Sequence, residues 1–417
     1  MKYHLVGIGG SMMSGLAEIL KNQGHEVTGS DLSTTGHSPD NIGAAERLVY
    51  SPAVKVGSPG YVELEAAKAK KVPTIRLEDL VAELTSEAKL VAITGTHGKS
   101  STTGMVATIL VKAGLNPTVL LGAPIPDWQG QNYRVGNPDL WVIEADDYDR
   151  KFLKYNPDLA IITNIEAEHL DIYKSLEDVE QAFGEFVKRV VSSGVIIAHN
   201  DPVVRKVVSN NFEMQEIHFY DADDDLADQL RSKLKLIGEH QLENAIAAVR
   251  LCEKMDIAPA SAIESLADYH GVGRRLEYIG SKAGVEVYDD YGHHPTELKV
   301  TISALKKKFP DRRLVVAFQA HQHSRVAKLY NDFLESFGDA DKVFAADIYA
   351  VPGREEEEYV DSRDFAKDIA SQGVDVVYAG DLDSLSKLLD SELKSGDVFV
   401  TIGATDITQV GRQWIKS

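Results

Sequence analysis

The sequence predicts an α/β protein of three domains, in which parallel strands alternate with helices. Three observations support this prediction. The chain has 417 residues, which suggests three domains at roughly 150 residues each. Short apolar runs alternate with helical patterns along most of the chain. Two junctions between an apolar run and a helical pattern are rich in glycine, at 7–10 and 95–98, as in nucleotide-binding strand–helix turns.

Composition and charge exclude several classes of protein. With 43% hydrophobic and 26% charged residues, the chain is globular. A formal net charge of −20 argues against a nucleic-acid partner. No apolar run reaches the length of a membrane span, so we expect no membrane insertion. The single cysteine, Cys252, excludes an internal disulfide and fits a reducing cytosol. We therefore expect a cytoplasmic protein with Cys252 in its core; the sequence leaves open whether it is a monomer or a homodimer.

The first domain, which we place at residues 1–87, begins as a Rossmann-like fold. An apolar strand at 3–8 leads into the first glycine turn, a helix at 11–23 and a second strand that ends at Asp31. The dinucleotide-binding fingerprint would place a third glycine where this chain has Met12. The motif alone therefore fits a plain turn about as well as a ligand site.

The strongest motif is a run in which an apolar strand leads into glycines, a lysine and hydroxyl residues: Gly95, Thr96, His97, Gly98, Lys99, Ser100 and Ser101. The N–H groups at the start of a helix lack intrahelical partners and carry partial positive charge, so a phosphate fits there. Lys99 can reach the terminal phosphates and Ser100 can bind a magnesium ion. Ile93 stands where the general P-loop has its first glycine, but a plain turn does not explain this order of residues. We predict nucleoside triphosphate binding.

Two later strands of the second domain, which we place at 88–270, end in polar residues. Glu144 follows the apolar run 140–143, and His169 comes soon after the run 159–163. Ligands of open parallel sheets bind beyond the carboxyl ends of strands, so these side chains and the phosphate loop should converge. Each alone fits an ordinary loop residue. Together they favour a Mg²⁺ site, because carboxylates and hydroxyls are hard oxygen ligands.

Two further patterns of the second domain are structural in our interpretation. The run Asp221-x-Asp223-x-Asp225 resembles the start of a calcium loop but lacks the glycine and the glutamate that such a loop requires later. We interpret it as a solvated acidic loop. Polar residues open a helix that runs from Gly238 to about Met255. They could cap the helix or contact a base, and the spacing favours capping.

The third domain, which we place at 271–417, is a second Rossmann-like α/β fold. Its expected strands lie near 285–289, 314–318, 342–346, 375–379 and 398–402. Two successive strand ends present Asp290, Tyr291, His293 and Arg325. Four histidines in these loops allow a metal site, but a guanidinium group beside a cation is repulsive. An arginine here more naturally holds a carboxylate or a phosphate.

The motifs, taken in order, resemble the Mur ligase family along the whole chain: GTHGKSSTT, EADDYD, TNIEAEH, GEHQLENA, GRRLE and DDYGHHPTE. The resemblance implies an ADP-forming amide ligase of peptidoglycan synthesis that uses ATP and Mg²⁺. The run FQAHQHSR at 318–325 and GATDI at 403–407 are most similar to members that join L-alanine to UDP-N-acetylmuramate through an acyl phosphate. Met12 and EADDYD are closer to the sister enzyme, which attaches a recycled tripeptide to the same sugar nucleotide.

The resemblance also implies roles for individual residues. The UDP substrate would contact Gly9, Gly10, Ser11, Asp31, His37 and Ser51. ATP would contact the phosphate loop together with Gln241, Asn244, Arg275 and Asp290. Magnesium would be held by Ser100, Glu144 and His169, and the amino acid by Tyr291, His293 and Arg325. The catalytic set would be Lys99, Glu144, His169, Asp290, His293 and Arg325. Two alternatives stay open: a catalytically silent nucleotide-binding protein, and a P-loop kinase that stops at phosphorylation.

Overall fold

The structure, a computed structural model, describes residues 1–168, 172–350 and 358–417, so His169 lies outside the described residues. The chain divides into two compact units. The first unit consists of Met1–Lys235 and Gln241–Gly271, and the second of Leu236–His240 and Val272–Ser417. The described residues form three sheets, in which parallel pairs predominate. The predicted α/β class is confirmed.

The first sheet has four parallel strands in the order β2-β1-β3-β4. Its elements are β1 (Lys2–Val6), α1 (Ser11–Asn22), β2 (Glu26–Ser30), η1 (Pro39–Ile42), β3 (Arg47–Tyr50), α2 (Tyr61–Ala69), β4 (Thr74–Arg76) and α3 (Leu77–Thr85). The strand order reverses beside β1, and such a switch point is where ligands bind in open α/β sheets. The first glycine turn follows β1 directly, so it lies at this position.

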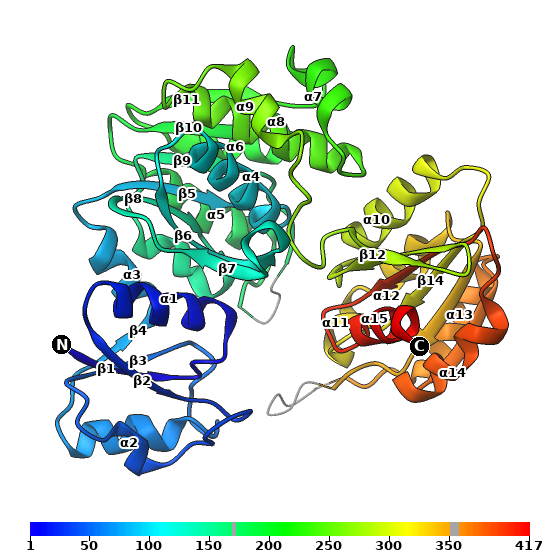
Figure 1. The fold of residues 1–417 in the computed structure, drawn as a ribbon, viewed down its shortest axis with the longest axis horizontal. Helices are drawn as coiled ribbons and strands as arrows, with labels where there is room; N and C mark the ends of the chain where they lie inside the picture. The colour runs from blue at the N-terminus through cyan, green and yellow to red at the C-terminus, as the bar shows by residue number, and fades with distance from the viewer. Residues whose placement is uncertain (169–171, 351–357) are drawn as a thin grey trace. The chain divides into compact units, whose positions relative to one another are not determined.

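Helix α1 lies between the first and second sheets (Figure 1). Gly15 makes the close approach possible, because a Cβ atom there would lie 2.6 Å from Leu120 Cδ1 of the second sheet. Leu16 and Leu20 of this helix belong to one buried core that also contains Leu120 and Trp141. The two sheets of the first unit therefore share a core.

The second sheet has seven strands in the order β11-β10-β9-β5-β8-β6-β7, and only β7 runs antiparallel to its neighbour. Its strands are β5 (Lys89–Thr94), β6 (Pro117–Ile125), β7 (Gln131–Arg134), β8 (Asn137–Glu144), β9 (Leu159–Ile162), β10 (Val195–His199) and β11 (Glu216–Tyr220). The phosphate-loop strand β5 lies between β8 and β9. The polar residues that follow these two strands, Glu144 after β8 and those beyond Ile162 after β9, therefore come from the two neighbours of β5.

Helices cover both faces of the second sheet (Figure 1). The helical elements are α4 (Lys99–Lys112), η2 (Pro126–Trp128), η3 (Tyr148–Lys154), α5 (Leu176–Val187), α6 (Pro202–Asn211), α7 (Ala227–Lys233), α8 (Glu239–Glu253) and α9 (Pro259–Leu266). Ser100–Leu110 of α4 are all buried, as expected for a helix that is enclosed on all sides. Cys252 is buried and unpaired in α8, which confirms its predicted place in the core.

The predicted solvated loop near residue 221 is held by charge pairs. Asp224 accepts a hydrogen bond from Arg250 of α8 at 2.7 Å, and Asp225 also pairs with this guanidinium group. Asp221 accepts from Asn200 Nδ2 at 2.6 Å. The loop is therefore tied to α8 and to the end of β10.

The third sheet, in the second unit, has the order β12-β13-β17-β14-β15-β16, and β12 is antiparallel to β13. Its strands are β12 (Glu277–Lys282), β13 (Val285–Asp290), β14 (Leu314–Phe318), β15 (Lys342–Ala346), β16 (Val376–Gly380) and β17 (Val398–Ile402). The last five match the five strands expected from the sequence. The edge strand β12 was not predicted.

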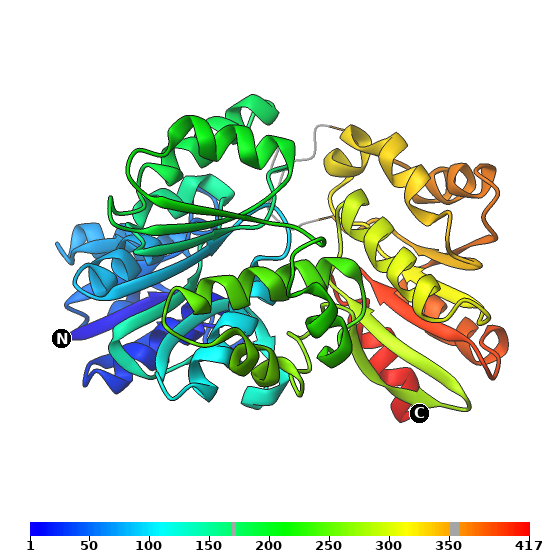
Figure 2. The same cartoon turned by 90° about the horizontal axis from the view of Figure 1, so that it is seen from above.

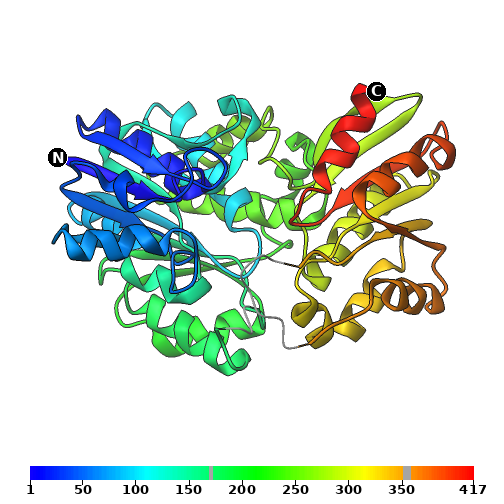
Figure 3. The same cartoon turned by 90° about the horizontal axis from the view of Figure 1, so that it is seen from below.

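Helices cover both faces of the third sheet (Figures 2 and 3). They are α10 (Pro295–Lys308), α11 (His323–Lys328), α12 (Tyr330–Leu334), η4 (Glu335–Phe337), α13 (Ser362–Ser371), α14 (Leu382–Glu392) and α15 (Thr408–Lys416). Side chains of α10, α12 and α13 form the core on one face, and those of α14 and α15 form the core on the other. In both views α15 runs beside the β12–β13 hairpin. Within the described ranges, no helix has the length and apolar character that crossing a lipid bilayer would need.

Candidate functional site

Both glycines of the phosphate loop are required by its geometry. Gly95 and Gly98 have positive φ values of 140° and 81°, a region that glycine adopts without steric penalty. A Cβ atom on Gly95 would lie 2.0 Å from Thr163 Oγ1, and one on Gly98 would lie 2.8 Å from Asn244 Oδ1. The loop therefore packs directly against the end of β9 and against α8.

The end of β9 holds the phosphate loop in place through hydrogen bonds. Asn164 Oδ1 accepts from His97 N at 2.7 Å, and Asn164 O accepts from Thr96 N at 3.1 Å. Thr163 Oγ1 donates to His97 O at 2.6 Å. The sequence placed Asn164 beyond a strand but gave it no role. Its position directly after the buried run 159–163 was the signal that could have indicated a role near the phosphate loop.

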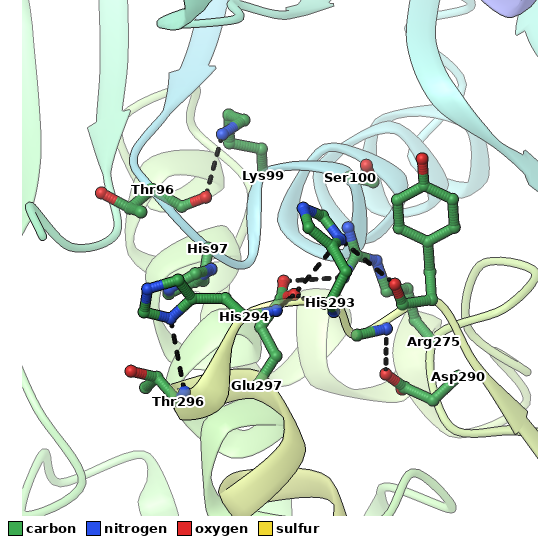
Figure 4. Close-up of polar contacts among 12 residues, drawn as sticks. Thr96, His97, Lys99, Ser100, Arg275, Asp290, His293, His294, Thr296 and Glu297 are labelled. Carbon is green, nitrogen blue, oxygen red and sulfur yellow. Dashed lines mark hydrogen bonds and ion pairs between the residues drawn. The ribbon is translucent and has the colours of Figure 1, made fainter. Parts of the chain in front are cut away.

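Lys99, the first residue of α4, turns its ammonium group back onto its own loop (Figure 4). Lys99 Nζ donates to Gly95 O at 2.5 Å, to Thr96 O at 3.0 Å and to Asp147 Oδ1 at 2.8 Å. Burial lowers the pKa of Lys99, but nearby carboxylates, chiefly Asp147 and Asp146, outweigh this effect and hold it above its usual value. The lysine is therefore a permanent positive charge in the loop.

The structure brings together two of the three predicted magnesium ligands. Ser100 Oγ donates to Glu144 Oε2 at 2.8 Å, and Gly122 N donates to the same oxygen at 2.8 Å. A serine hydroxyl beside a carboxylate is a donor set that suits Mg²⁺. His169, the third predicted ligand, lies outside the described residues.

Two polar side chains predicted to contact ATP are buried near the start of α8. Gln241 and Asn244 are 5% and 7% exposed. Asn244 packs against Gly98 of the phosphate loop. The side-chain oxygen Oε1 of Gln241 is buried and has no hydrogen-bond partner among the described residues. Buried polar atoms are rarely left in this state, so a ligand group that donates a hydrogen bond would satisfy this one.

At the end of the first sheet, the glycine turn contacts Asp31. Gly9 N donates to Asp31 Oδ2 at 3.2 Å, and a Cβ atom on Gly9 would lie 2.9 Å from the same carboxylate. Hydrogen bonds from the Ser33 side chain and backbone lower the pKa of Asp31. Gly10 and Ser11 begin α1 at this turn, and Ser51 follows β3.

His37, another predicted contact of the UDP substrate, is anchored by a buried acid. Its Nδ1 lies 2.9 Å from Glu63 Oε1, and Glu63 also accepts from His4 Nε2 and Ser30 Oγ at 2.8 Å each. Burial raises the pKa of Glu63, but its hydrogen bonds, led by those from Asn41 and Ser30, hold it below the usual value. The sequence gave no sign of this network, because Glu63 sits in an ordinary helical pattern.

In the second unit, Asp290 ends β13 and shapes the loop that follows. Its two carboxylate oxygens accept from Gly292 N at 2.7 Å and from Leu276 N at 2.8 Å. Burial raises the pKa of Asp290 to about 6, with Arg275 opposing this shift and Glu297 adding to it. Both oxygens are thus occupied by backbone donors.

The three predicted amino-acid contacts come together around His321. The ring of His293 meets those of Tyr291 and His321 edge-on, with centroids 5.4 Å and 5.1 Å apart. Arg325 Nη1 lies 3.4 Å from His321 Nε2. Among the described residues, no carboxylate pairs with Arg325. The cluster therefore has a guanidinium group available for an external anion, and His321 is a member to which the sequence assigned no role.

Arg275 and Glu297 complete the second unit's polar loop, as the close-up in Figure 4 shows. Arg275 Nη1 lies 3.1 Å from Glu297 Oε1, and its guanidinium group lies 5.3 Å from the centre of the Tyr291 ring. Glu297 Oε2 accepts from His293 N at 2.9 Å. Arg275 therefore stabilises both the start of α10 and the Tyr291 ring.

Comparison with known proteins identifies the family. Three family descriptions match successive segments: "Mur ligase family, catalytic domain" at 2–89, "Mur ligase middle domain" at 93–252 and "Mur ligase, glutamate ligase domain" at 274–405. A relative from Lawsonia intracellularis, named UDP-N-acetylmuramate–L-alanine ligase, is 36% identical over 99% of this chain and 98% of its own length. The chain belongs to the Mur ligase family.

Other relatives agree with this assignment. A protein of the same name from Aquifex aeolicus is 34% identical to this Mur ligase, and the match covers 100% of this chain and 97% of the relative. Among solved structures, a UDP-N-acetylmuramate–alanine ligase from Thermotoga maritima superposes with a TM-score of 0.82 at 24% identity, covering 100% of this chain and 98% of that one. A murein peptide ligase from Psychrobacter arcticus gives 0.71 at 22% identity, with the same coverage. These likenesses confirm the predicted three-domain α/β fold.

This Mur ligase thus has most of its predicted site residues in two groups, which the structure describes separately. The first unit holds the phosphate loop, the Ser100–Glu144 pair and the Gly9–Asp31 turn. The second unit holds the cluster around Tyr291 and Arg325. The residues that sequence reasoning missed, such as Asn164 and Glu63, position these side chains through hydrogen bonds.

Proposed function

We propose that this Mur ligase joins L-alanine to the lactoyl carboxylate of UDP-N-acetylmuramate, with ATP as the energy source, in the synthesis of peptidoglycan precursors. The observation that carries the proposal is the end-to-end match to relatives of that name, at 34–36% identity over at least 99% of the chain in the two cases above. The phosphate loop and the available Arg325 in the polar cluster support it independently.

The chemistry explains why a cationic loop is needed. A carboxylate becomes a good acyl donor once it is phosphorylated, so the lactoyl carboxylate first attacks the γ-phosphorus of ATP, which gives an acyl phosphate and releases ADP. Two unit negative charges at ~4 Å repel each other by about 4 kcal/mol at an effective dielectric constant of ~20. Lys99 would counter this repulsion. A bound Mg²⁺ would neutralise further phosphate charge, and we propose Ser100, Glu144 and His169 as the side chains that hold magnesium.

In the second step the neutral amine of L-alanine attacks the acyl carbon, and inorganic phosphate leaves. We favour His293 over Asp290 as the group that takes the proton of the amine. Both oxygens of Asp290 already accept backbone hydrogen bonds. The Nδ1 atom of His293 lies 3.3 Å from Tyr291 O, which can only accept. A neutral His293 that donates from Nδ1 has its lone pair on Nε2, as a general base requires.

The remaining roles are proposals of the same kind. Gln241 and Asn244 would contact adenine, and Arg275 and Asp290 would lie against the nucleotide. The UDP moiety would bind at the turn of Gly9, Gly10 and Ser11, with Asp31, His37 and Ser51. Arg325 would hold the carboxylate of the amino acid, with Tyr291 and His293 beside it. We also propose domain limits of 1–87, 88–270 and 271–417, and a cytoplasmic location.

The second candidate is the ligase that recycles a tripeptide. Met12 and the EADDYD motif favour it, and a murein peptide ligase shares the fold. The alanine ligase remains our first choice, because the relatives from Lawsonia intracellularis and Aquifex aeolicus carry that name. The two candidates share the acceptor and differ in the amine.

The test measures phosphate release by the purified full-length protein with ATP, Mg²⁺ and UDP-N-acetylmuramate. L-alanine, glycine, L-serine and the tripeptide are supplied in separate reactions. Release that depends on L-alanine is the expected result. Release with the tripeptide alone would assign the protein to recycling. Formation of ADP without any amine, measured in the same reactions, would indicate a kinase, and formation of neither ADP nor phosphate with any amine would indicate a silent nucleotide-binding protein.

A further inference from the structure

The ammonium group of Lys99 has no unused hydrogen-bond donor. It carries three N–H groups, and it has three acceptors: Gly95 O, Thr96 O and Asp147 Oδ1, at 2.5, 3.0 and 2.8 Å. A nucleotide phosphate must therefore replace at least one of these acceptors before it can bond to Lys99.

The three acceptors differ in how readily they can be replaced. Gly95 O and Thr96 O belong to the backbone of the phosphate loop, which Thr163 and Asn164 hold in place. The Asp147 acceptor is a side-chain carboxylate, which rotates about single bonds. Asp147 is therefore the acceptor that can release Lys99 without a change in the loop.

Release would leave the Asp147 carboxylate in an unfavourable position. Its side chain is 2% exposed, and its backbone carbonyl is fixed by Tyr173 Oη at 2.6 Å and by Arg150 N at 3.0 Å. A buried charge that loses its partner is strongly destabilised. Another cation must therefore reach Asp147 when Lys99 turns to a phosphate.

The neighbouring oxygen ligands of Ser100 and Glu144 suggest which cation this is. Asp147 follows Glu144 by three residues, and Glu144 bonds to Ser100, which directly follows Lys99. The Lys99–Asp147 ion pair and the Ser100–Glu144 hydrogen bond thus join the same two chain segments. A divalent cation held by Ser100 and Glu144 would bring positive charge to the segment that carries Asp147.

We propose that Asp147 is an exchangeable counter-ion of Lys99, which holds the lysine on its own loop and releases it to the nucleotide when a divalent cation arrives at Ser100 and Glu144. Asp147 is then a positioning residue that makes nucleotide binding depend on the metal. The inference rests on the proposed ATP-dependent function and goes beyond it, because it assigns a role to a residue outside the predicted site.

The test measures the affinity of the full-length protein for ADP by calorimetry, once with Mg²⁺ and once with EDTA. In Asp147→Asn we expect metal-free ADP binding to tighten about tenfold, which lies within the usual range of coupling between two sites. The factor by which Mg²⁺ strengthens ADP binding should shrink by about the same amount. Asp147→Glu keeps the charge and should restore the dependence on Mg²⁺. Asp149→Asn is the matched control, because Asp149 pairs with Arg76 at 2.7 Å and, within the described ranges, makes no hydrogen bond to the phosphate loop.

A second measurement needs no change at Asp147. In Lys99→Met the carboxylate lacks its cation, so the nucleotide-free protein should bind Mn²⁺ about tenfold more tightly than the unmodified chain. The proposal is wrong if Asp147→Asn weakens ADP binding equally with and without Mg²⁺, or if Lys99→Met leaves Mn²⁺ affinity unchanged. If the unmodified protein binds no ADP under either condition, the proposed function itself fails.

Discussion

The phosphate loop of the first unit and the polar cluster of the second are built in different ways. The loop is fixed by hydrogen bonds that its backbone N–H groups donate to Asn164, and by glycines with no room for a side chain. The cluster is fixed largely by rings, with Tyr291 beneath Arg274 and Arg275 at 4.8 and 5.3 Å. A loop held by its backbone has one geometry, whereas stacked side chains tolerate adjustment. We therefore expect substitutions in the loop to cause abrupt losses of activity or binding, and substitutions in the cluster to cause graded losses.

The largest expected effect is at Lys99. Lys99→Met should lower kcat for ADP formation about 10³-fold, because it removes the positive charge that we propose for stabilising the transferring phosphate. It should also lower the unfolding temperature, since Asp147 loses its cation. Initial-rate assays and thermal unfolding provide the measurements. Lys151→Met is the control, because Lys151 pairs with Asp146 at 2.7 Å outside the loop. Equal losses in the two variants would contradict the role assigned to Lys99.

A smaller, graded effect is expected at Arg325. Arg325→Lys keeps the charge but loses the two-pronged geometry that matches a carboxylate. We expect KM for L-alanine to rise roughly 10- to 100-fold, which corresponds to a charge-assisted hydrogen bond. The affinity for ADP, measured by calorimetry, should stay constant. A change in ADP affinity with no change in KM would place Arg325 at the nucleotide instead.

Gly98 allows the loop's rigidity to be measured directly. Gly98→Ala should weaken ADP binding about tenfold, because an αL alanine costs about 1–2 kcal/mol and its Cβ atom would lie 2.8 Å from Asn244 Oδ1. Gly114→Ala is the matched control, since Gly114 has φ +82° and no atom within 4 Å of the added Cβ. Both variants should lose stability, and only Gly98→Ala should lose ADP affinity. Normal ADP binding by Gly98→Ala would show that the loop adjusts as the cluster does.

The last expected effect is on stability alone, and it is the pH dependence of stability that arises from Asp290. Its pKa is raised to about 6 in the folded chain, so the folded state favours the protonated acid. Between about pH 4 and pH 6 the unfolded carboxyl loses its proton first, and this contribution to stability falls as pH rises. The full difference is at most about 3 kcal/mol. Asp290→Asn should remove this slope, as measured by the unfolding temperature at a series of pH values. An unchanged slope would mean that Asp290 is ionised throughout this range.

The sequence predicted many of the apolar strands, although β6 and β10 were not predicted and are also largely buried. The central strands β5, β8 and β9 and five strands of the third sheet are short buried runs, and each was located to within a few residues. The edge strands β7 (QNYR) and β12 (EYIGSK) were not recognised. An edge strand is partly solvated and carries polar residues, so it lacks the apolar signal on which such a prediction depends.

The candidate site was predictable where a role depends on local order. The glycines, Lys99 and Ser100 lie within one short run, and Glu144 follows a buried strand. The contact between Lys99 and Asp147 joins residues 48 positions apart, and the Glu63–His4 bond joins residues 59 apart. Nothing in either local sequence marks such pairs, because they form only when distant elements pack together.

The shared core of the first unit has a practical consequence for anyone who prepares fragments of this enzyme. Leu16 and Leu20 of α1 are buried in the same core as Leu120 and Trp141, and Asn132 donates a hydrogen bond to the carbonyl of Ser11. A cut near residue 87 would expose this apolar surface on both pieces. The useful truncation is at the border near Gly271, where the first compact unit ends.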